Sequence, residues 1–186
     1  MKKLLLILTK NTTMKRLLLI LLCFPMIGFG QINYYEDEGI SFTYPSTYLL
    51  DSATPTPIPQ MQLKHKDPSY FGNFMIDRYS LSDLGGSGNE TLKGIGDGII
   101  KLLETQFNSI NVKFGLISKE VEIISSKEIY VIKNSLTFLL ESYYNVLCIY
   151  KKDDKIFTIT LTAGSEEESF IYLSDMKMIL KSVVLK

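Results

Sequence analysis

Few side chains of this sequence could act as nucleophiles or as general acids and bases. His65 is the only histidine, and it lies between Lys64 and Lys66 on an expected strand. A Ser-His-Asp or Cys-His catalyst needs a histidine as its base, but no serine stands in the G-x-S-x-G context of a nucleophile elbow. We therefore interpret His65 as an exposed strand residue, and a single imidazole excludes metal sites built from several histidines.

Cys148 is the one cysteine outside the N-terminal thirty residues, and apolar residues surround it from Tyr144 to Tyr150. A cysteine buried among apolar side chains has a raised pKa and behaves as a small hydrophobic residue. We expect Cys148 to be an inert core residue.

Three acidic clusters could offer oxygen ligands to a cation such as Ca²⁺: Glu36-Asp37-Glu38, Asp153-Asp154 and Glu166-Glu167-Glu168. Calcium requires six to eight oxygens from a shaped loop, and none of the clusters follows the spaced pattern of a calcium loop. The second is typical of a turn and the third of a helix start. The first, beside Gly39, is the candidate cation site, although we assign no metal ligand, catalytic residue or cofactor.

The segment Gly86-Ser87-Gly88 precedes an expected helix, as phosphate-binding loops do. Thr91 stands where the third glycine of the dinucleotide fingerprint belongs, and no parallel βαβ unit surrounds the segment. We interpret it as a flexible loop.

Tyrosine is the most promising residue type for binding, because aromatic side chains bring a large contact area at low entropic cost. All eleven tyrosines lie after the first thirty residues. Tyrosine is also an ordinary strand residue. The candidate interaction surface consists of Tyr34, Tyr35, Tyr48, Tyr70, Tyr143 and Tyr144.

The first thirty residues have the pattern of a secretory signal peptide. Met14-Lys15-Arg16 is followed by the apolar run Leu17–Phe24, Pro25 and the small residues Gly28 and Gly30. We expect cleavage near Gly30, with translation starting at Met1 or at Met14. Lipid attachment at Cys23 and retention as an anchor are the alternatives, but Leu22 is large for a lipid-modified site and the apolar run is too short to span a bilayer.

Removal of this leader changes the charge balance. It contains five of the 20 basic residues and none of the 20 acidic ones, which leaves 15 against 20 and a net charge of about −5. Nucleic-acid binding needs clustered lysine and arginine, so we exclude it. The mature chain would hold only Cys148, and export without disulfides favours a bacterial periplasm or cell surface.

The rest of the chain, residues 31–186, has the length of one domain with a core of its own. Strands are expected at Ile40–Tyr44, Met61–Lys66 and Phe71–Tyr79, where apolar and polar side chains alternate. Thr54–Pro59 is an extended loop, because prolines remove amide donors. Apolar spacing then predicts a helix over Glu90–Phe107 with Asn89 as its N-cap.

Gly94, Gly96 and Gly98 each weaken that helix by about 1 kcal/mol relative to alanine. Its first half should therefore fray or pack closely against a neighbour. Beyond it, four segments rich in β-branched and aromatic residues predict a four-strand meander: Glu120–Ser125, Ile129–Leu139, Tyr143–Lys151 and Lys155–Ala163.

Ser165 and Glu168 form a capping box that opens a final helix. In that helix Phe170, Leu173 and Leu180 should share a side, with Met176 and Ile179 adjacent. The apolar end Val183–Leu185 should be fixed to the body of the protein.

Clustered strands with separate helices predict a mostly antiparallel sheet of the α+β class. The segment Gly39–Pro45, sequence GISFTYP, and the end of the chain, from Phe157–Ala163 to Ile179–Val183, resemble the Mog1/PsbP-like family. This resemblance implies a sheet sandwiched between helices. It also implies a non-enzymatic role, since better-known members assist a photosynthetic complex or bind a small GTPase. Tyr48 stands where the family usually has tryptophan, and no binding residue can be carried over.

The sequence favours an exported, non-catalytic binding or assembly module whose partner is another envelope or extracellular protein, with no transmembrane span after the leader. Two alternatives remain. One is an enzyme that uses the carboxylates of Glu36-Asp37-Glu38, with or without a cation. The other is a small-ligand or lipid carrier with an apolar pocket between the sheet and the helix that Gly94, Gly96 and Gly98 loosen.

Overall fold

The computed structural model describes residues 31–37, 39–53, 60–70, 72–82 and 89–186. The chain divides into two compact units, Met1–Ile32 and Asn33–Lys186, and the fold is that of the second. The expected signal peptide over 1–30, the proline-rich loop, the glycine-rich segment Gly85–Gly88 and Glu38 lie outside the described residues.

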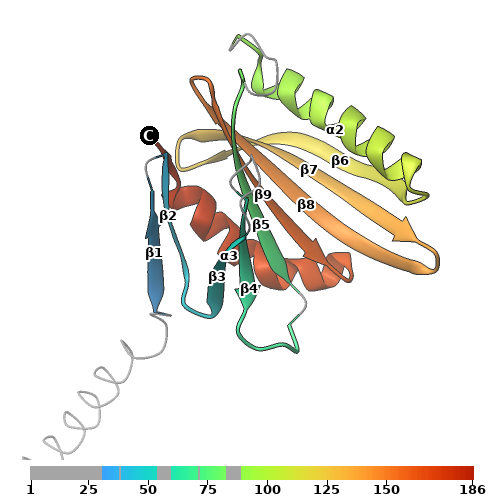
Figure 1. Ribbon diagram of the computed structural model, residues 1–186, viewed down its shortest axis with the longest axis horizontal. Helices are drawn as coiled ribbons and strands as arrows, with labels where there is room; N and C mark the ends of the chain where they lie inside the picture. Colours follow the sequence, from blue (N-terminus) through green and yellow to red (C-terminus); the bar gives the residue numbers. More distant parts are fainter. Residues whose placement is uncertain (1–30, 38, 54–59, 71, 83–88) are drawn as a thin grey trace, which may run out of the picture. The chain divides into compact units, whose positions relative to one another are not determined.

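The largest element of the fold is a seven-stranded sheet in which every neighbouring pair is antiparallel. This confirms the α+β class predicted from the sequence. Figure 1 shows the strands in the spatial order β3 (Tyr48–Ala53), β4 (Gln60–His65), β5 (Asn73–Ser80), β9 (Lys155–Ala163), β8 (Glu141–Lys152), β7 (Lys127–Phe138) and β6 (Lys113–Ile124).

Strands β6 to β9 follow one another both in the chain and in the sheet, so the expected four-strand meander is confirmed. Two-residue turns join them, since Ile124 pairs with Lys127, Phe138 with Glu141 and Lys152 with Lys155. The strand β6 begins seven residues before its predicted start. The sequence pattern did not reveal β3 at all, because Pro45 and the following polar residues suggested a loop.

A second, three-stranded sheet contains β1 (Ile32–Glu36), β2 (Ile40–Pro45) and β10 (Val184–Leu185). Its central strand β2 pairs antiparallel with β10, with Val184 opposite Ser41 and Leu185 opposite Ile40. The apolar C-terminal end is therefore fixed by pairing, as its composition predicted.

Two helices cover opposite faces of the large sheet, α2 (Leu92–Ser109) and α3 (Glu166–Ser182). Residues of β7 alternate between the two faces, because Ile129 and Val131 pack in the core beneath α3, whereas Tyr130 and Ile132 pack beneath α2. The arrangement is the helix–sheet–helix sandwich that the family resemblance implied (Figure 1).

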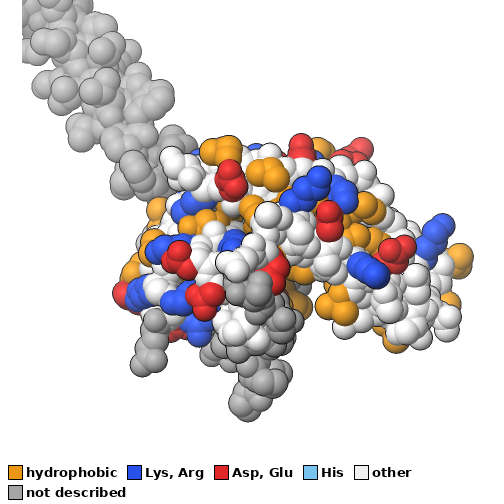
Figure 2. Space-filling view, turned by 90° about the horizontal axis from the view of Figure 1, so that it is seen from above, with side chains coloured by type: hydrophobic (Ala, Val, Ile, Leu, Met, Phe, Trp, Pro, Cys, Tyr) orange, Lys and Arg blue, Asp and Glu red, His pale blue; other side chains and the backbone are white. Residues whose placement is uncertain are grey.

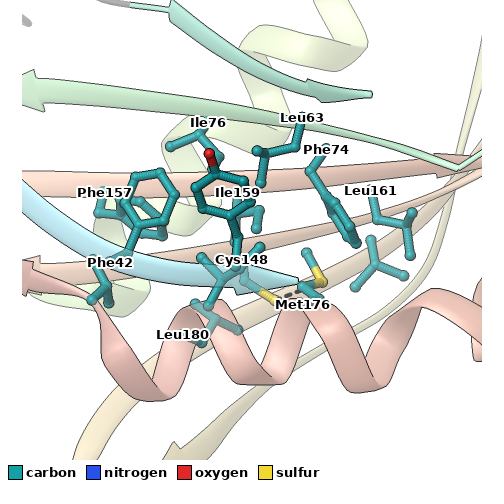
Figure 3. Close-up of a cluster of buried hydrophobic side chains, with 14 of the residues drawn as sticks. Phe42, Leu63, Phe74, Ile76, Cys148, Phe157, Ile159, Leu161, Met176 and Leu180 are labelled. Carbon is teal, nitrogen blue, oxygen red and sulfur yellow. Dashed lines mark hydrogen bonds between the residues drawn. The ribbon is translucent and has the colours of Figure 1, made fainter. Parts of the chain in front are cut away.

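The main core lies between the large sheet, β2 and α3. Figure 3 shows Phe42 from β2, Phe157 and Ile159 from β9, and Met176 and Leu180 from α3 pointing toward one another. Phe42, Phe157 and Ile159 have no exposed surface. Burial of a side chain of this size contributes about 1.5–3 kcal/mol, so this layer holds α3 and β2 on the sheet.

Helix α2 lies over β6, β7 and β8 and closes a smaller core on that face. Its N-cap is Thr91, whose hydroxyl accepts from the Gly94 amide at 3.1 Å, so the prediction of Asn89 as the cap is wrong by two residues. A Cβ at Gly96 would lie 2.2 Å from the ring of Tyr130. The glycine is thus needed for close packing, one of the two outcomes that the sequence left open.

Helix α3 begins at the predicted cap, where the Ser165 hydroxyl accepts from the Glu168 amide at 3.1 Å. The Glu168 carboxylate accepts from the amide of Gly164, one residue before the cap. The predicted inward position of Phe170 is wrong, because 63% of this residue is exposed. The buried face of α3 is turned by one residue from the predicted one and consists of Ser169, Tyr172, Met176, Ile179 and Leu180.

Candidate interaction surface

Two of the six tyrosines proposed for an interaction surface are core residues, so the prediction is wrong for them. Tyr48 is 1% exposed, and its hydroxyl donates to Asp175 Oδ2 at 2.9 Å across to α3. Burial, reinforced by the Asp175 charge, raises the Tyr48 pKa. Tyr144 is 6% exposed and faces Glu166. Both side chains point to the sheet face that α3 covers. Without the strand register, the sequence could not predict which face a strand residue points to.

The other four tyrosines lie on three separate parts of the protein. Tyr34 is exposed on β1, where Tyr35 is half-buried and packs 5.2 Å from Phe42. Tyr70 is exposed between β4 and β5, and Tyr143 is half-buried near the β7–β8 turn. Because β1 and this turn lie on opposite sides of the sheet layers (Figure 1), the six tyrosines do not form one patch.

His65 belongs to a ring cluster at the end of β4. Its ring centroid lies 4.4 Å from that of Tyr70 and 5.3 Å from that of Tyr48. Nδ1 of His65 accepts from the Asp67 amide at 3.1 Å, which fixes the turn after the strand. The imidazole is half-buried instead of exposed as predicted, and its contacts make it a packing residue.

The Cys148 thiol lies in the main core, 3.9 Å from the sulfur of Met176 (Figure 3). Burial, with a smaller contribution from the Glu122 charge, raises the pKa of this thiol to about 12. The thiolate, which is the nucleophilic form, is then scarce at neutral pH. Cys148 is the inert core residue that its neighbours predicted.

The acidic cluster that looked most like a cation site is a turn closed by its own hydrogen bonds. Oδ1 of Asp37 accepts from the amides of Gly39 and Ile40 at 2.8 and 2.9 Å, and from Arg78 at 3.0 Å. Oδ2 accepts from the Tyr35 hydroxyl. A cation that binds Oδ1 of Asp37 would compete with Arg78, which already supplies a positive charge there.

The pKa of Asp37 reflects this environment. Partial burial acts to raise it, but the hydrogen bonds from Gly39, Tyr35 and Ile40 and the charge of Arg78 outweigh burial and hold the pKa below its usual value. Glu36 is engaged by Lys186 and Tyr34, whose hydrogen bonds lower its pKa. In the part of the chain that the structure describes, no three acidic, histidine or cysteine side chains group as metal ligands do.

Among the residues that the structure describes, the two most exposed large apolar side chains lie at the β7–β8 turn, a place that the tyrosine pattern does not mark. Phe138 is 49% exposed, Leu139 82% and Leu140 100%. Ile110, which ends α2 just before β6, is also exposed, and Lys113 at the start of β6 pairs with Thr137 beside the turn. We call Ile110, Phe138, Leu139 and Leu140 the apolar tip.

The segments next to the apolar tip along the sheet are rich in carboxylates. Glu141 follows it directly, and its carboxylate accepts from the Tyr143 hydroxyl at 2.7 Å. The acidic start of α3 lies over β8 on the same end of the sheet, since Ala163 pairs with Tyr144 and Tyr144 reaches Glu166. Lys113 is the basic residue among these segments. The four acidic residues are Glu141, Glu166, Glu167 and Glu168.

Figure 2, which keeps the horizontal direction of Figure 1, shows hydrophobic side chains at the right-hand end, where the β7–β8 hairpin ends. A signal for this surface was present in the sequence. Leu139-Leu140 separates two strong strand patterns, at a place where turn residues such as glycine, asparagine or aspartate are expected.

Comparison with solved structures identifies the architecture. The solution structure of cyanobacterial PsbP (CyanoP) from Synechocystis sp. PCC 6803 superposes with a TM-score of 0.64 and 14% sequence identity. The alignment covers 86% of this chain and 95% of that protein. The chain has the PsbP-like fold. The family resemblance read from Gly39–Pro45 and from the end of the chain is therefore confirmed at the level of the fold.

A crystal structure from Bacteroides thetaiotaomicron is also similar, with a TM-score of 0.54 and 15% identity. The match spans 84% of this chain but 48% of that protein, so the similarity covers about half of that longer chain. No family model matches the sequence, and no curated protein matches it. At these identities the likeness concerns the fold alone.

Neither α2 nor α3, the helices that the structure describes, is long and apolar enough to cross a bilayer.

Proposed function

We propose that the protein is an exported, non-catalytic binding module that acts through contact with another protein of the envelope or the extracellular space. In this proposal residues 1–30 direct export and are removed, and residues 31–186 form the working domain. The observation that carries the proposal is the apolar tip, where the fully exposed Leu140 stands at the end of a continuously paired hairpin.

The chemistry of the described residues supports a binding role over catalysis. His65 is packed among tyrosines, and the Cys148 thiol is buried. The Asp37 carboxylate already accepts hydrogen bonds from the amides of its own turn and from Arg78. These were the side chains with the best prospects of acting as base, nucleophile or metal ligand. A catalytic site needs such groups to converge within hydrogen-bonding reach, and here they lie in separate parts of the fold.

The exposed apolar residues support the binding role directly. Leucine at full exposure costs hydration free energy that a partner surface would recover, and large apolar patches on soluble proteins mark sites of interaction. The PsbP-like fold fits this role, because the Mog1/PsbP-like resemblance implies non-enzymatic members that work by association.

A direct test uses the full-length protein produced in its own host. Fractionation and N-terminal sequencing should find it outside the cytoplasm and beginning near Gln31. Affinity purification from the envelope fraction should recover a protein that also binds when both are purified, with a Kd measured by calorimetry. Turnover of a substrate by the purified protein, with no such partner recovered, would refute the proposal.

A further inference from the structure

We propose that the apolar tip is the docking element of the protein, and that it inserts Leu139 and Leu140 into an apolar cleft bordered by basic residues on a partner protein. This inference rests on the proposed binding function and names the surface and the chemistry of the partner.

The shape of the tip defines what can receive it. Leu140 is fully exposed and Leu139 nearly so, and both stand at the end of a hairpin whose strands pair without interruption from Phe138–Glu141 to Ile129–Tyr150. A convex apolar end on a long, paired ribbon fits a concave site. Leucine side chains at the centre of such a contact are fully desolvated, which is the position where binding energy concentrates.

The conformation of the turn indicates that these leucines serve something other than folding. Leu139 has a φ of 55°, in the left-handed region where glycine and asparagine are the usual residues. The other two turns of the meander have polar residues in that region, Ser125 and Ser126 in one and Asp153 in the other. A branched apolar residue at this position suits neither the turn nor the solvent, and such local conflicts are typical of functional sites.

The charges near the tip indicate which charges should border the cleft on the partner. Glu141 adjoins the tip, the three glutamates at the start of α3 follow Ala163, which pairs with Tyr144 on β8, and Lys113 is the one basic residue of these segments. Basic residues around the partner's cleft would complement these carboxylates and accelerate association. The same carboxylates disfavour an anionic lipid surface, and they disfavour a second copy of this chain, which would bring an identical acidic rim.

The first experiment places the photo-crosslinking residue p-benzoylphenylalanine at position 140 of the full-length protein in its host. The matched control carries it at position 126, the second residue of the β6–β7 turn, which has the same two-residue length. We expect one protein adduct from position 140 and none from position 126. A lipid adduct, or no adduct at position 140, would overturn the proposal.

The second experiment titrates the crosslinked protein, once purified, against variants. Leu140→Asp should weaken binding by about 30-fold, as for a central contact residue. Ser126→Asp should change it by less than about 2-fold. Glu141→Lys should lower the association rate and reduce its dependence on salt, because the rim charge steers the encounter. Circular dichroism of each variant verifies the fold, which an exposed turn residue should not disturb.

The outcomes separate this inference from the proposed function. If the partner binds and Leu140→Asp leaves its Kd unchanged, the tip is not the docking element, whereas the binding function stands. Flotation of the protein with phosphatidylcholine–phosphatidylglycerol vesicles, abolished by Leu140→Asp, would assign the tip to lipid and overturn the proposal. Loss of affinity in Leu140→Asp but not in Ser126→Asp, together with the adduct at position 140, supports the proposal.

Discussion

The two ends of the β6–β9 meander are built from opposite kinds of residue. At one end the turns Ser125-Ser126 and Asp153-Asp154 are polar, and the lysines beside them donate to the end of the chain. Nζ of Lys127 donates to the carbonyl oxygens of Leu180 and Lys181, and Nζ of Lys152 to that of Leu185. At the other end the turn is Leu139-Leu140, and it points into water.

The difference shows which end the fold needs. The polar end secures the end of α3 and β10, and its turn residues, serine and aspartate, are common in turns. The apolar end contributes little to the core, since leucine that is 82–100% exposed buries almost no surface. A feature that costs solvation and turn energy without stabilising the fold is the one to test for function.

The largest expected effect contrasts two neighbours on the β7–β8 hairpin. Tyr144→Ala should lower the free energy of unfolding by about 3 kcal/mol, because it removes a buried aromatic ring beneath α3. Leu140→Ala, four residues away, should change it by less than about 0.5 kcal/mol. Urea denaturation at neutral pH measures both. A comparable loss for Leu140→Ala would mean that the tip is structural, and the contrast between the two ends would fail.

The sequence predicted the order of elements well, because that order depends on local patterns. The strand Lys155–Ala163 was placed with its observed bounds, and Ser165 was identified as the cap of α3. Alternation and capping act within a few residues, so they can be read without the tertiary structure.

The predictions that failed depended on which neighbour covers a face. Phe170 was expected inside and is exposed, whereas Tyr48 and Tyr144 were expected at the surface and are buried. Each of these depends on the rotation of α3 over the sheet and on the unrecognised strand β3. Composition could not decide them, since tyrosine suits both a strand interior and an interface.

The candidate site was missed for a related reason. The abundance of tyrosine points to a residue type and not to a position, and the expected strand Ile129–Leu139 includes one leucine of the turn and leaves the other in a connection. Turn chemistry would have singled them out, because Leu139-Leu140 occupies the place where the two other tight turns of the meander have serine or aspartate.

A smaller effect should appear at the polar end, where Asp37 pairs with Arg78 close to the β8–β9 turn. Asp37→Asn should lower the free energy of unfolding at pH 7 by about 1–2 kcal/mol, through loss of charge-assisted hydrogen bonds. The folded-state pKa lies below the usual value of 3.8. The stabilisation is therefore complete above that value and disappears as the pH falls through the lower, folded-state pKa.

Denaturant unfolding of both proteins between neutral and acidic pH checks this prediction. The two stability curves should converge on the acidic side, where the carboxyl group of Asp37 is protonated in both states. Glu128→Gln, on an exposed position of β7, is the matched carboxylate control. If the difference in free energy of unfolding between the two proteins stays constant down to the lowest pH, the substitution acts through packing and not through charge. The contribution of Asp37 to the polar end would then be steric.

The smallest effect has the opposite sign and tests the tip itself. Leu139→Gly should raise the free energy of unfolding by about 1 kcal/mol, because glycine adopts positive φ without the steric cost that leucine carries. Asp153→Gly, at the equivalent position of the β8–β9 turn, should gain less, since aspartate tolerates this conformation. If the Leu139→Gly protein is more stable and also binds its partner less tightly, the wild-type leucine lowers the stability of the fold but strengthens binding. A loss of stability in Leu139→Gly would instead place Leu139 among the residues that hold the hairpin together.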